Sequence, residues 1–525
     1  MAPNPLLLSS SHTLCHFPIF PKTLTPRSVS PFSCRSSLSH ASSPHSDSSS
    51  IEPSGTGAAA PTRGDLFLER QQSRSAATVV LKQGKKNSKK KRAAASKLSS
   101  AIACCYGCGA PLQTEEMEAP GYVDPETYEL KKKHRQLRTV LCGRCKLLSH
   151  GHMVTAVGGH GGYPGGKQFV TAEELREKLS HLRHEKVLIV KLVDIVDFNG
   201  SFLSRIRDLA GANPIILVAT KVDLLPKGTE LNCIGDWVVD ATIKKKLNVI
   251  SVHLTSSKSL VGIVGVIAEI QKEKKGRDVY ILGSANVGKS AFINALLKMM
   301  GEKDPVAAAA QKYKPIQSAV PGTTLGPIQI EAFQGGGKLF DTPGVHLHHR
   351  QAAVVDSEDL PSLAPKNRLR AQSFPVLPET RLTFYGPRQL PIHMVPTSEA
   401  DQFYHRELGI SLTPPTGNQR AEAWPGLQVV RQLQINFENR QRPACDIAIS
   451  GLGWIAIEPF SSHLNADPNG NNEADLKELH LAVHVPKPVE VFVRPPMPVG
   501  KAGEEWYEYQ ELTEKEEELR PKWFF

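Results

Sequence analysis

The chain has 525 residues, too many for one hydrophobic core, and its 40% hydrophobic and 22% charged residues are typical of a globular protein of roughly two to four domains. It contains no run of about 18 apolar residues, which excludes a membrane-spanning helix. The 63 Lys and Arg against 52 Asp and Glu give a net charge of +11, which favours a polyanionic partner without identifying it.

Residues 1–60 have the composition of a transit peptide. The first acidic residue is Asp47, and the first 50 residues contain 15 serines and few basic residues. We expect import into the chloroplast, with the mitochondrion as second choice and a plain disordered tail as the alternative. Residues 61–100 are expected to be a disordered linker. Its basic run at 82–92 is either a solvated spacer or an arm that contacts RNA phosphates.

Residues 101–165 are expected to form a zinc finger. Two C-x-x-C pairs, Cys105 with Cys108 and Cys142 with Cys145, can direct four thiolates at one tetrahedral ion, which suits Zn²⁺. Disulfide pairing is the alternative, and a reducing compartment makes it less favourable. The basic segment at 131–138 between the pairs is either a surface that faces RNA or a solvated helix face.

The next part of the chain alternates helices with apolar strands, which indicates a parallel α/β sheet. The pattern predicts helices at Glu173–His184 and Ser201–Gly211. It predicts strands at Val187–Asp194, Pro214–Thr220 and Asn248–Leu254.

Two of these strands end in motifs that resemble the guanine-reading loops of GTPases. The segment 220–223, TKVD, resembles Asn-Lys-x-Asp, in which Asp223 would accept hydrogen bonds from guanine and the stem of Lys221 would lie along the base. Thr220 replaces the usual Asn and so lacks the amide that bridges base and phosphate loop. The segment 255–258, TSSK, resembles the loop whose backbone N–H meets the guanine O6.

A phosphate-binding loop follows at 283–290. A strand at Val279–Leu282 leads into GSANVGKS and then into a helix that begins at Ser290, which fits G-x-x-x-x-G-K-[ST]. The backbone would surround the phosphates, Lys289 would contact their oxygens, and Ser290 would ligate Mg²⁺. Asn286 matches the Asn that helps coordinate K⁺ in related GTPases; a hydrogen bond within the loop is its alternative role.

Two further segments resemble the switches of a GTPase. PGTT at 321–324 resembles switch I, with Thr324 as a Mg²⁺ ligand. DTPG at 341–344 follows a predicted strand at Lys338–Phe340 and resembles switch II, with Asp341 holding a magnesium water and Gly344 donating to the γ-phosphate. Many GTPases have Gln after this glycine, whereas Val345 cannot orient water. We therefore expect slow turnover that K⁺ or a ribosome stimulates.

All the parts of a GTPase site are present, but the base-reading loops precede the phosphate loop. Together with the double C-x-x-C, this order resembles the YqeH family of circularly permuted GTPases over residues 100 to 525. The resemblance implies a permuted GTPase domain at 166–370 and catalytic roles for Lys289, Asn286, Thr324 and Gly344. The expected GTP-binding residues are Thr220, Lys221, Asp223, Ser256, Ser257, Lys258, Gly283, Asn286, Val287, Gly288, Lys289, Ser290, Ala291, Thr323, Thr324, Asp341 and Gly344.

The resemblance also implies a biological role, in small ribosomal subunit biogenesis through rRNA binding. Rival hypotheses are nitric-oxide synthesis, for which no haem-thiolate or flavin motif is evident, and a nucleotide-dependent scaffold with negligible turnover.

Residues 371–525 are expected to form a β-rich domain that interacts with RNA or the ribosome, because short apolar runs alternate there with Pro and Gly. Trp454, Phe492 and Arg494 could stack on bases. For Trp454, core packing is the favoured alternative.

Overall fold

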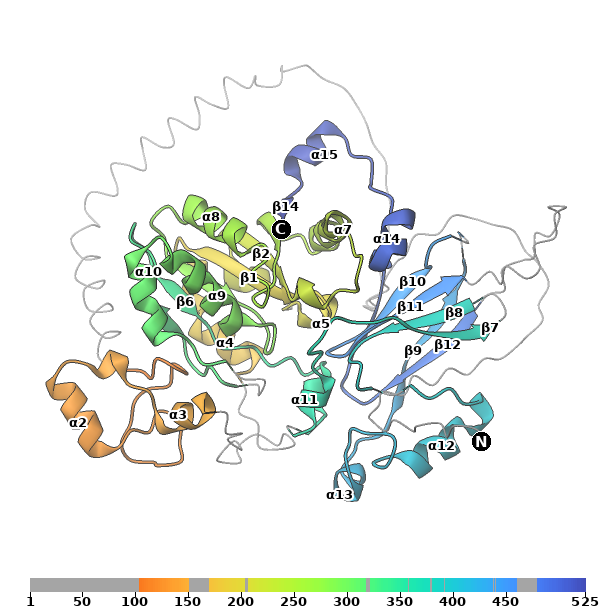
Figure 1. Ribbon diagram of the computed structural model, residues 1–525, viewed down its shortest axis with the longest axis horizontal. Helices are drawn as coiled ribbons and strands as arrows, with labels where there is room; N and C mark the ends of the chain where they lie inside the picture. Colours follow the sequence, from red (N-terminus) through yellow and green to blue (C-terminus); the bar gives the residue numbers. More distant parts are fainter. Residues whose placement is uncertain are drawn as a thin grey trace, which may run out of the picture. The chain divides into compact units, whose positions relative to one another are not determined.

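A computed structural model describes residues 103–150, 170–203, 206–317, 322–356, 358–377, 380–390, 392–437, 439, 441–459 and 479–525 (Figure 1). The predicted transit peptide and the basic linker lie outside these ranges. Within them, no helix is both long enough and apolar enough to cross a membrane.

A seven-stranded sheet forms the centre of the predicted GTPase domain. Its strand order is β14-β3-β2-β1-β4-β6-β5, and every neighbouring pair is parallel except β5 with β6. This is the mostly parallel sheet that the sequence predicts. The strands are β1 (Leu188–Asp194), β2 (Ile215–Thr220), β3 (Val249–Leu254), β4 (Val279–Leu282), β5 (Ile328–Ile330), β6 (Leu339–Asp341) and β14 (Lys522–Phe524).

Helices cover both faces of this sheet, because alternate residues of its strands enter two separate apolar cores. Leu188, Val190 and Leu192 of β1 pack with α8 and α9, whereas Ile189 and Val193 pack with α4, α6 and α7. The sheet helices are α4 (Ala172–Lys178), α6 (Ile206–Ala210), α7 (Leu231–Ile243), α8 (Ile263–Lys274), α9 (Lys289–Gly301) and α10 (Pro305–Ala310).

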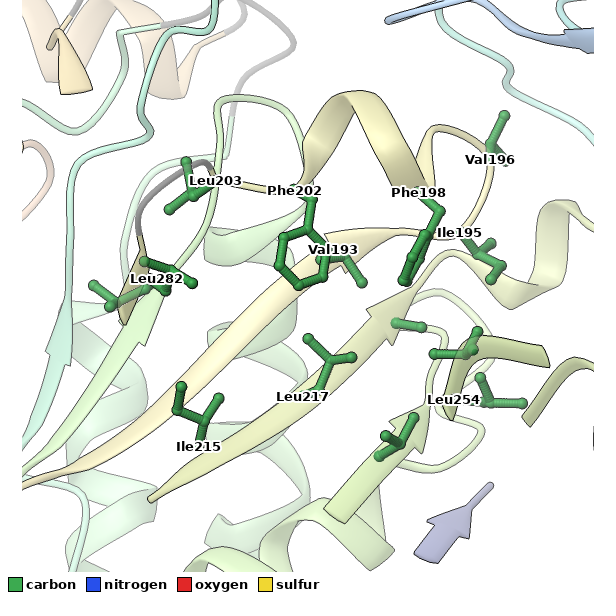
Figure 2. Packing of buried hydrophobic residues seen from close by; sticks show 14 of the residues in the cluster. Val193, Ile195, Val196, Phe198, Phe202, Leu203, Ile215, Leu217, Leu254 and Leu282 are labelled. Carbon is green, nitrogen blue, oxygen red and sulfur yellow. The ribbon is translucent and has the colours of Figure 1, made fainter. Parts of the chain in front are cut away.

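The predicted helix Ser201–Gly211 is wrong in extent. The structure has a single turn, α5 (Phe198–Ser201), and then the short α6, with extended backbone at Phe202 between them. Phe198 and Phe202 are both buried, and Figure 2 shows their rings over the strands near Val193 and Leu217. The extended backbone at Phe202 accompanies a buried edge-to-face contact between the two rings, whose centres are 5.7 Å apart.

The strand order places the nucleotide site. From β1 the chain adds β2 and β3 on one side, and it then returns to place β4 on the other side of β1. Ligands of open parallel sheets bind at the carboxyl ends of the strands where the order reverses in this way. Here that point lies between β1 and β4, where the loop 283–288 begins.

The C-terminal domain is β-rich, as predicted. A five-stranded antiparallel sheet has the order β13-β10-β11-β8-β7, and β9 pairs with β12 in a second sheet. The strands are β7 (Gln372–Leu377), β8 (Thr380–Tyr385), β9 (Gln428–Ile435), β10 (Cys445–Ile449), β11 (Gly453–Pro459), β12 (Leu479–Val485) and β13 (Val491–Arg494). The helices are α11 (Leu360–Leu363), α12 (Ala400–Glu407) and α13 (Asn418–Glu422).

The suggested RNA-stacking role of Trp454 and Arg494 is wrong, because both side chains are buried. The Arg494 guanidinium lies 4.9 Å from the ring centre of Trp237 and 5.3 Å from that of Trp454, and it pairs with Asp446. Trp237 belongs to α7. These side chains therefore join the C-terminal domain to the GTPase domain.

The end of the chain returns to the GTPase sheet. After α14 (Gly500–Trp506) and α15 (Glu514–Leu519), β14 pairs with β3 as the edge strand. Arg520 pairs with Asp236 and Asp240 of α7, and the Trp523 ring packs so closely on Gly235 that a Cβ there would lie 2.1 Å from it. The last residues thus stabilise α7 and β3.

The described part of the predicted finger contains α2 (Pro125–Lys133) and α3 (Gly143–Ser149) around a small core. Asp124 begins α2 by accepting a hydrogen bond from the Thr127 N–H.

Short 3-10 helices connect the larger elements along the described chain. They are η1 (Leu137–Thr139), η2 (Ser180–Arg183), η3 (Val222–Leu224), η4 (Gln311–Tyr313), η5 (Gln351–Ala353) and η6 (Thr397–Glu399).

Candidate GTP and metal sites

The phosphate loop connects β4 to α9, and α9 begins at Lys289, one residue earlier than predicted. Asn286 and Gly288 have φ values of +62° and +91°, which turn the backbone into a tight curve. Nζ of Lys289 donates to the carbonyl oxygens of Gly283 at 3.1 Å and Ser284 at 2.9 Å. The amine therefore lies inside the curve, where phosphate oxygens would bind.

Lys289 faces Asp341, which ends β6. Burial lowers the pKa of Lys289 to about 8, although the Asp341 charge opposes this shift. Burial raises the pKa of Asp341 to about 7, opposed by Lys289 and by the Thr324 hydroxyl. Two buried groups of opposite charge, both held away from water, form an environment in which phosphate and metal charges interact strongly.

The groups expected at the magnesium site fit that ion. Asp341 is fully buried, and neither carboxylate oxygen has a hydrogen-bond partner of normal geometry among the described residues, although the Thr324 hydroxyl interacts with the carboxylate. Ser290 lies in the first turn of α9 and Thr324 is buried. Carboxylate and hydroxyl oxygens with unused capacity are the donors that Mg²⁺ prefers.

The predicted switch II segment packs directly on the phosphate loop. A Cβ on Gly344 would lie 3.0 Å from both Nζ of Lys289 and Cα of Ala285, so only glycine fits without a shift. The N–H of Ala285 donates to the Val345 carbonyl at 2.7 Å, and the N–H of Val345 donates to the Gly283 carbonyl at 3.3 Å. Val345 is buried, and its apolar side chain has no group that could hydrogen-bond a water.

The two predicted base-reading loops lie side by side. The N–H of Thr255 donates to the Ala219 carbonyl at 2.8 Å, and the N–H of Val222 donates to the Thr255 carbonyl at 3.1 Å. Oγ of Ser256 accepts from the N–H groups of Lys258 and Ser259. These bonds keep TKVD and TSSK together at one end of the sheet.

One expectation is corrected at Thr220. Although this residue lacks the amide of the usual Asn, its side chain still contacts the phosphate loop. Its Oγ1 lies 2.7 Å from the Val287 carbonyl oxygen and 3.0 Å from the Val193 carbonyl oxygen, and these two acceptors share its one hydroxyl proton. Nζ of Lys221 forms a second link: it donates to Oδ2 of Asp194 at 2.5 Å and to the carbonyl oxygen of Asn286 at 2.9 Å. Strand β2 is therefore tied to the phosphate loop by two side chains.

Sequence reasoning missed Arg350, a buried residue six positions after Gly344. Nη1 donates to the carbonyl of Ala285 in the phosphate loop at 2.7 Å, and Nε pairs with Asp197 at 2.9 Å. An Asp after β1 and an Arg after switch II are visible in the sequence. Their spacing in the sequence does not predict the contact between Asp197 and Arg350.

The four predicted cysteines form one buried cluster whose Sγ atoms all lie within 4.8 Å of one another. None is in a disulfide. The set fits a tetrahedral Zn²⁺ site, and Cys104 is exposed beside it.

Two protein-family models match the chain. The model for the 50S ribosome-binding GTPase family matches residues 278–364, and the model for the YqeH-like C-terminal domain matches residues 379–497. The first contains the phosphate loop and both segments after it, and the second contains most of the C-terminal strands.

Several proteins resemble the chain over most of its length. A protein of Oryza sativa subsp. japonica, provisionally named nitric oxide synthase, is 65% identical over the whole of both chains. NO-associated protein 1, chloroplastic/mitochondrial, of Arabidopsis thaliana is 65% identical over 90% of this chain and 91% of its own. Protein YqeH of Bacillus subtilis is 32% identical over 74% of this chain and 98% of its own.

Proposed function

Because the chain belongs to the family of GTPases that contains YqeH and plant NO-associated protein 1, we propose that it is a GTP-hydrolysing factor of the chloroplast that acts in small ribosomal subunit biogenesis. The observation that carries the proposal is the convergence of Lys289, Asp341, Thr324 and Gly344 beside two loops that resemble guanine readers. Mg²⁺ would offset phosphate charge between Ser290, Thr324 and Asp341.

The ribosomal partner follows from the family resemblance and from charge. The exposed side chains of Lys132, Lys133, Arg135 and Arg138 lie between the cysteine pairs of the finger, and a basic surface of this kind could contact RNA phosphates. The chloroplast follows from the composition of residues 1–60 and from the name of the Arabidopsis relative.

Sedimentation with ribosomal subunits tests this role. The full chain is mixed with purified chloroplast 30S or 50S subunits in the presence of a non-hydrolysable GTP analogue or of GDP. We expect co-sedimentation with 30S subunits in the GTP-like state and release in GDP. The 50S subunits are included because the matched GTPase family is described as 50S ribosome-binding. Binding to 50S subunits alone would contradict the small-subunit role.

Val345 stands where many GTPases have a catalytic Gln. We propose that K⁺ accelerates hydrolysis here by offsetting the developing charge on the phosphates. The Asn286 carbonyl accepts from Lys221, and its side chain is exposed at the loop. A cation beside the β- and γ-phosphates would act as an arginine finger does, a role worth about 10³ to 10⁵ in rate. Hydrolysis should be faster in K⁺ than in Na⁺ at equal ionic strength, and Asn286→Ala should remove the difference. Equal rates in both salts for the unaltered chain would contradict this.

Nitric-oxide synthesis is the second candidate, and the names of two relatives favour it. Incubation of the purified chain with arginine, a reduced cofactor and oxygen, followed by detection of nitric oxide, tests it. Formation of nitric oxide that depends on the chain would support this candidate over a purely GTP-dependent role.

A further inference from the structure

We propose that the zinc finger positions switch I of the GTPase site. Two contacts from the finger hold the backbone on either side of Thr324, so that this threonine is placed for Mg²⁺ before the nucleotide binds. The inference rests on the proposed GTP hydrolysis and assigns a role in it to a finger residue, Arg144.

Arg144 holds the segment that precedes Thr324. Its Nη2 donates to the Gly322 carbonyl at 2.9 Å, and its Nη1 reaches the Thr323 carbonyl at 3.5 Å. Arg144 lies in the C-x-x-C turn between Cys142 and Cys145, so the two sulfur ligands fix its backbone. Charge-assisted hydrogen bonds of this kind are about twice as strong as neutral ones.

The first cysteine pair holds the segment that follows Thr324. The carbonyl oxygen of Cys108 accepts hydrogen bonds from the N–H of Leu325 at 2.7 Å and from the N–H of Gly326 at 3.1 Å. A backbone atom of a metal-ligating residue thus carries the contact, and its position depends on the geometry of the cysteine cluster.

The surfaces of the two parts are also matched in shape. A Cβ on Gly109 would lie 2.2 Å from the Gly326 carbonyl oxygen, and a Cβ on Gly326 would lie 2.4 Å from the Gly109 carbonyl oxygen. Leu325 and Ile316 pack against the cysteine cluster. An approach this close leaves no room for a side chain at either glycine.

These contacts bear on the magnesium site, because the residue between them is Thr324. It is 6% exposed, and its hydroxyl interacts with Asp341. Switch I of many GTPases becomes ordered only through the γ-phosphate and its Mg²⁺. A finger that orders the segment beforehand lowers the entropic cost of binding GTP, and GDP gains nothing because it has no γ-phosphate.

A structural role alone would have a different signature. If the finger only stabilised the fold, its loss would weaken GTP and GDP alike. If it positions Thr324, then the loss falls on GTP affinity and on the Mg²⁺ requirement, while GDP affinity stays constant.

The test uses full chains carrying Arg144→Ala or Gly326→Ala. Arg144→Ala removes the hydrogen bonds to the backbone before Thr324. Gly326→Ala inserts a methyl group into the contact with Gly109 after Thr324, without touching zinc or nucleotide. Lys146→Ala is the matched control, since Lys146 is an exposed basic residue of the same helix, α3, as Arg144. Zinc content, GTP and GDP affinities, and single-turnover hydrolysis against Mg²⁺ concentration are measured for each.

We expect both variants to keep their zinc and GDP affinity, to bind GTP about tenfold more weakly and to need more Mg²⁺, with Lys146→Ala unchanged. Arg144→Lys, which keeps the positive charge and N–H donors but loses the forked geometry of the guanidinium, should recover part of the loss. Unchanged GTP affinity in both variants, or equal losses for GTP and GDP, would overturn the inference. Failure of the unaltered chain to bind GTP would instead overturn the proposed function.

Discussion

The guanidinium of Arg350 forms a buried ion pair with the carboxylate of Asp197, with Nε 2.9 Å from Oδ2. Nη1 of Arg350 also donates to the carbonyl of Ala285 in the phosphate loop. The next residue, Gln351, donates its N–H to the Ser450 carbonyl in the turn between β10 and β11 at 3.0 Å. One ion pair therefore lies where the phosphate loop, the segment after switch II and the C-terminal domain meet.

Arg350→Met should destabilise the fold by about 3–5 kcal/mol, because it leaves the Asp197 carboxylate buried without its partner. Burial already raises the pKa of Asp197, and the Arg350 charge opposes that shift. Unfolding in urea measures the loss. Asp197→Asn combined with Arg350→Met should cost much less than the sum of the single changes, whereas strictly additive losses would show that the two groups do not interact.

Thr220→Val should weaken GTP binding and lower the free energy of unfolding by about 1–3 kcal/mol. Valine has the same shape, but it leaves the Val287 and Val193 carbonyls without the hydroxyl donor. Thr220→Ser keeps the hydroxyl and is the control. Calorimetric titration with GTP and urea unfolding provide the two measurements. A Thr220→Val chain as stable as Thr220→Ser would contradict the bridging role.

Asp223→Asn should shift nucleotide preference from guanine to xanthine. An amide donates to the xanthine O2, where the carboxylate accepts from the guanine 2-amino group. Sites that depend on buried hydrogen bonds discriminate by about 10⁴ or more. Competition between GTP and XTP for the full chain measures the change. Unchanged GTP affinity in the variant would remove Asp223 from the base site.

The motifs of the nucleotide site could be predicted because each one is local. GSANVGKS determines its own backbone curve, and Lys289 and Ser290 follow from the spacing alone. The parallel sheet also followed from apolar runs such as the fully buried β1. The permuted order does not keep these loops apart, since their positions in space and not their order in the chain decide which of them meet.

Contacts between distant segments could not be predicted in the same way. The pairing of β14 with β3 joins residues more than 250 positions apart, and a three-residue strand has no periodicity to read. The contact of Arg144 with Gly322 spans 178 positions. Arg494 resembled a surface group in sequence because its burial depends on Asp446 and two Trp rings that only the fold brings together.

The edge strand β14 should make stability depend on pH through His253. This histidine lies in β3, stacks on Phe524 with ring centres 5.1 Å apart, and has its pKa lowered to about 4 by burial. Below pH 6.5 the unfolded chain takes up a proton that the folded chain does not. Neutral His253 therefore costs no stability above pH 6.5, and the free energy of unfolding decreases as the pH falls from 6.5 toward 4.

Between pH 7 and 5 this effect should amount to about 2 kcal/mol. Urea unfolding of the unaltered chain and of His253→Gln across that range measures it, and the variant should show a flatter dependence. Identical pH dependences in the two chains would contradict a neutral, buried His253.

Phosphate release from GTP by the full chain, compared with the Lys289→Ala variant, tests most directly whether this permuted site is the hydrolytic site. Lys289 lies inside the phosphate loop facing Asp341, so its loss should abolish release at saturating Mg²⁺. We expect release from GTP and not from ATP, dependent on Mg²⁺ and absent in Lys289→Ala. Equal release by both chains, or release from ATP as fast as from GTP, would contradict a guanine-specific GTPase site at these residues.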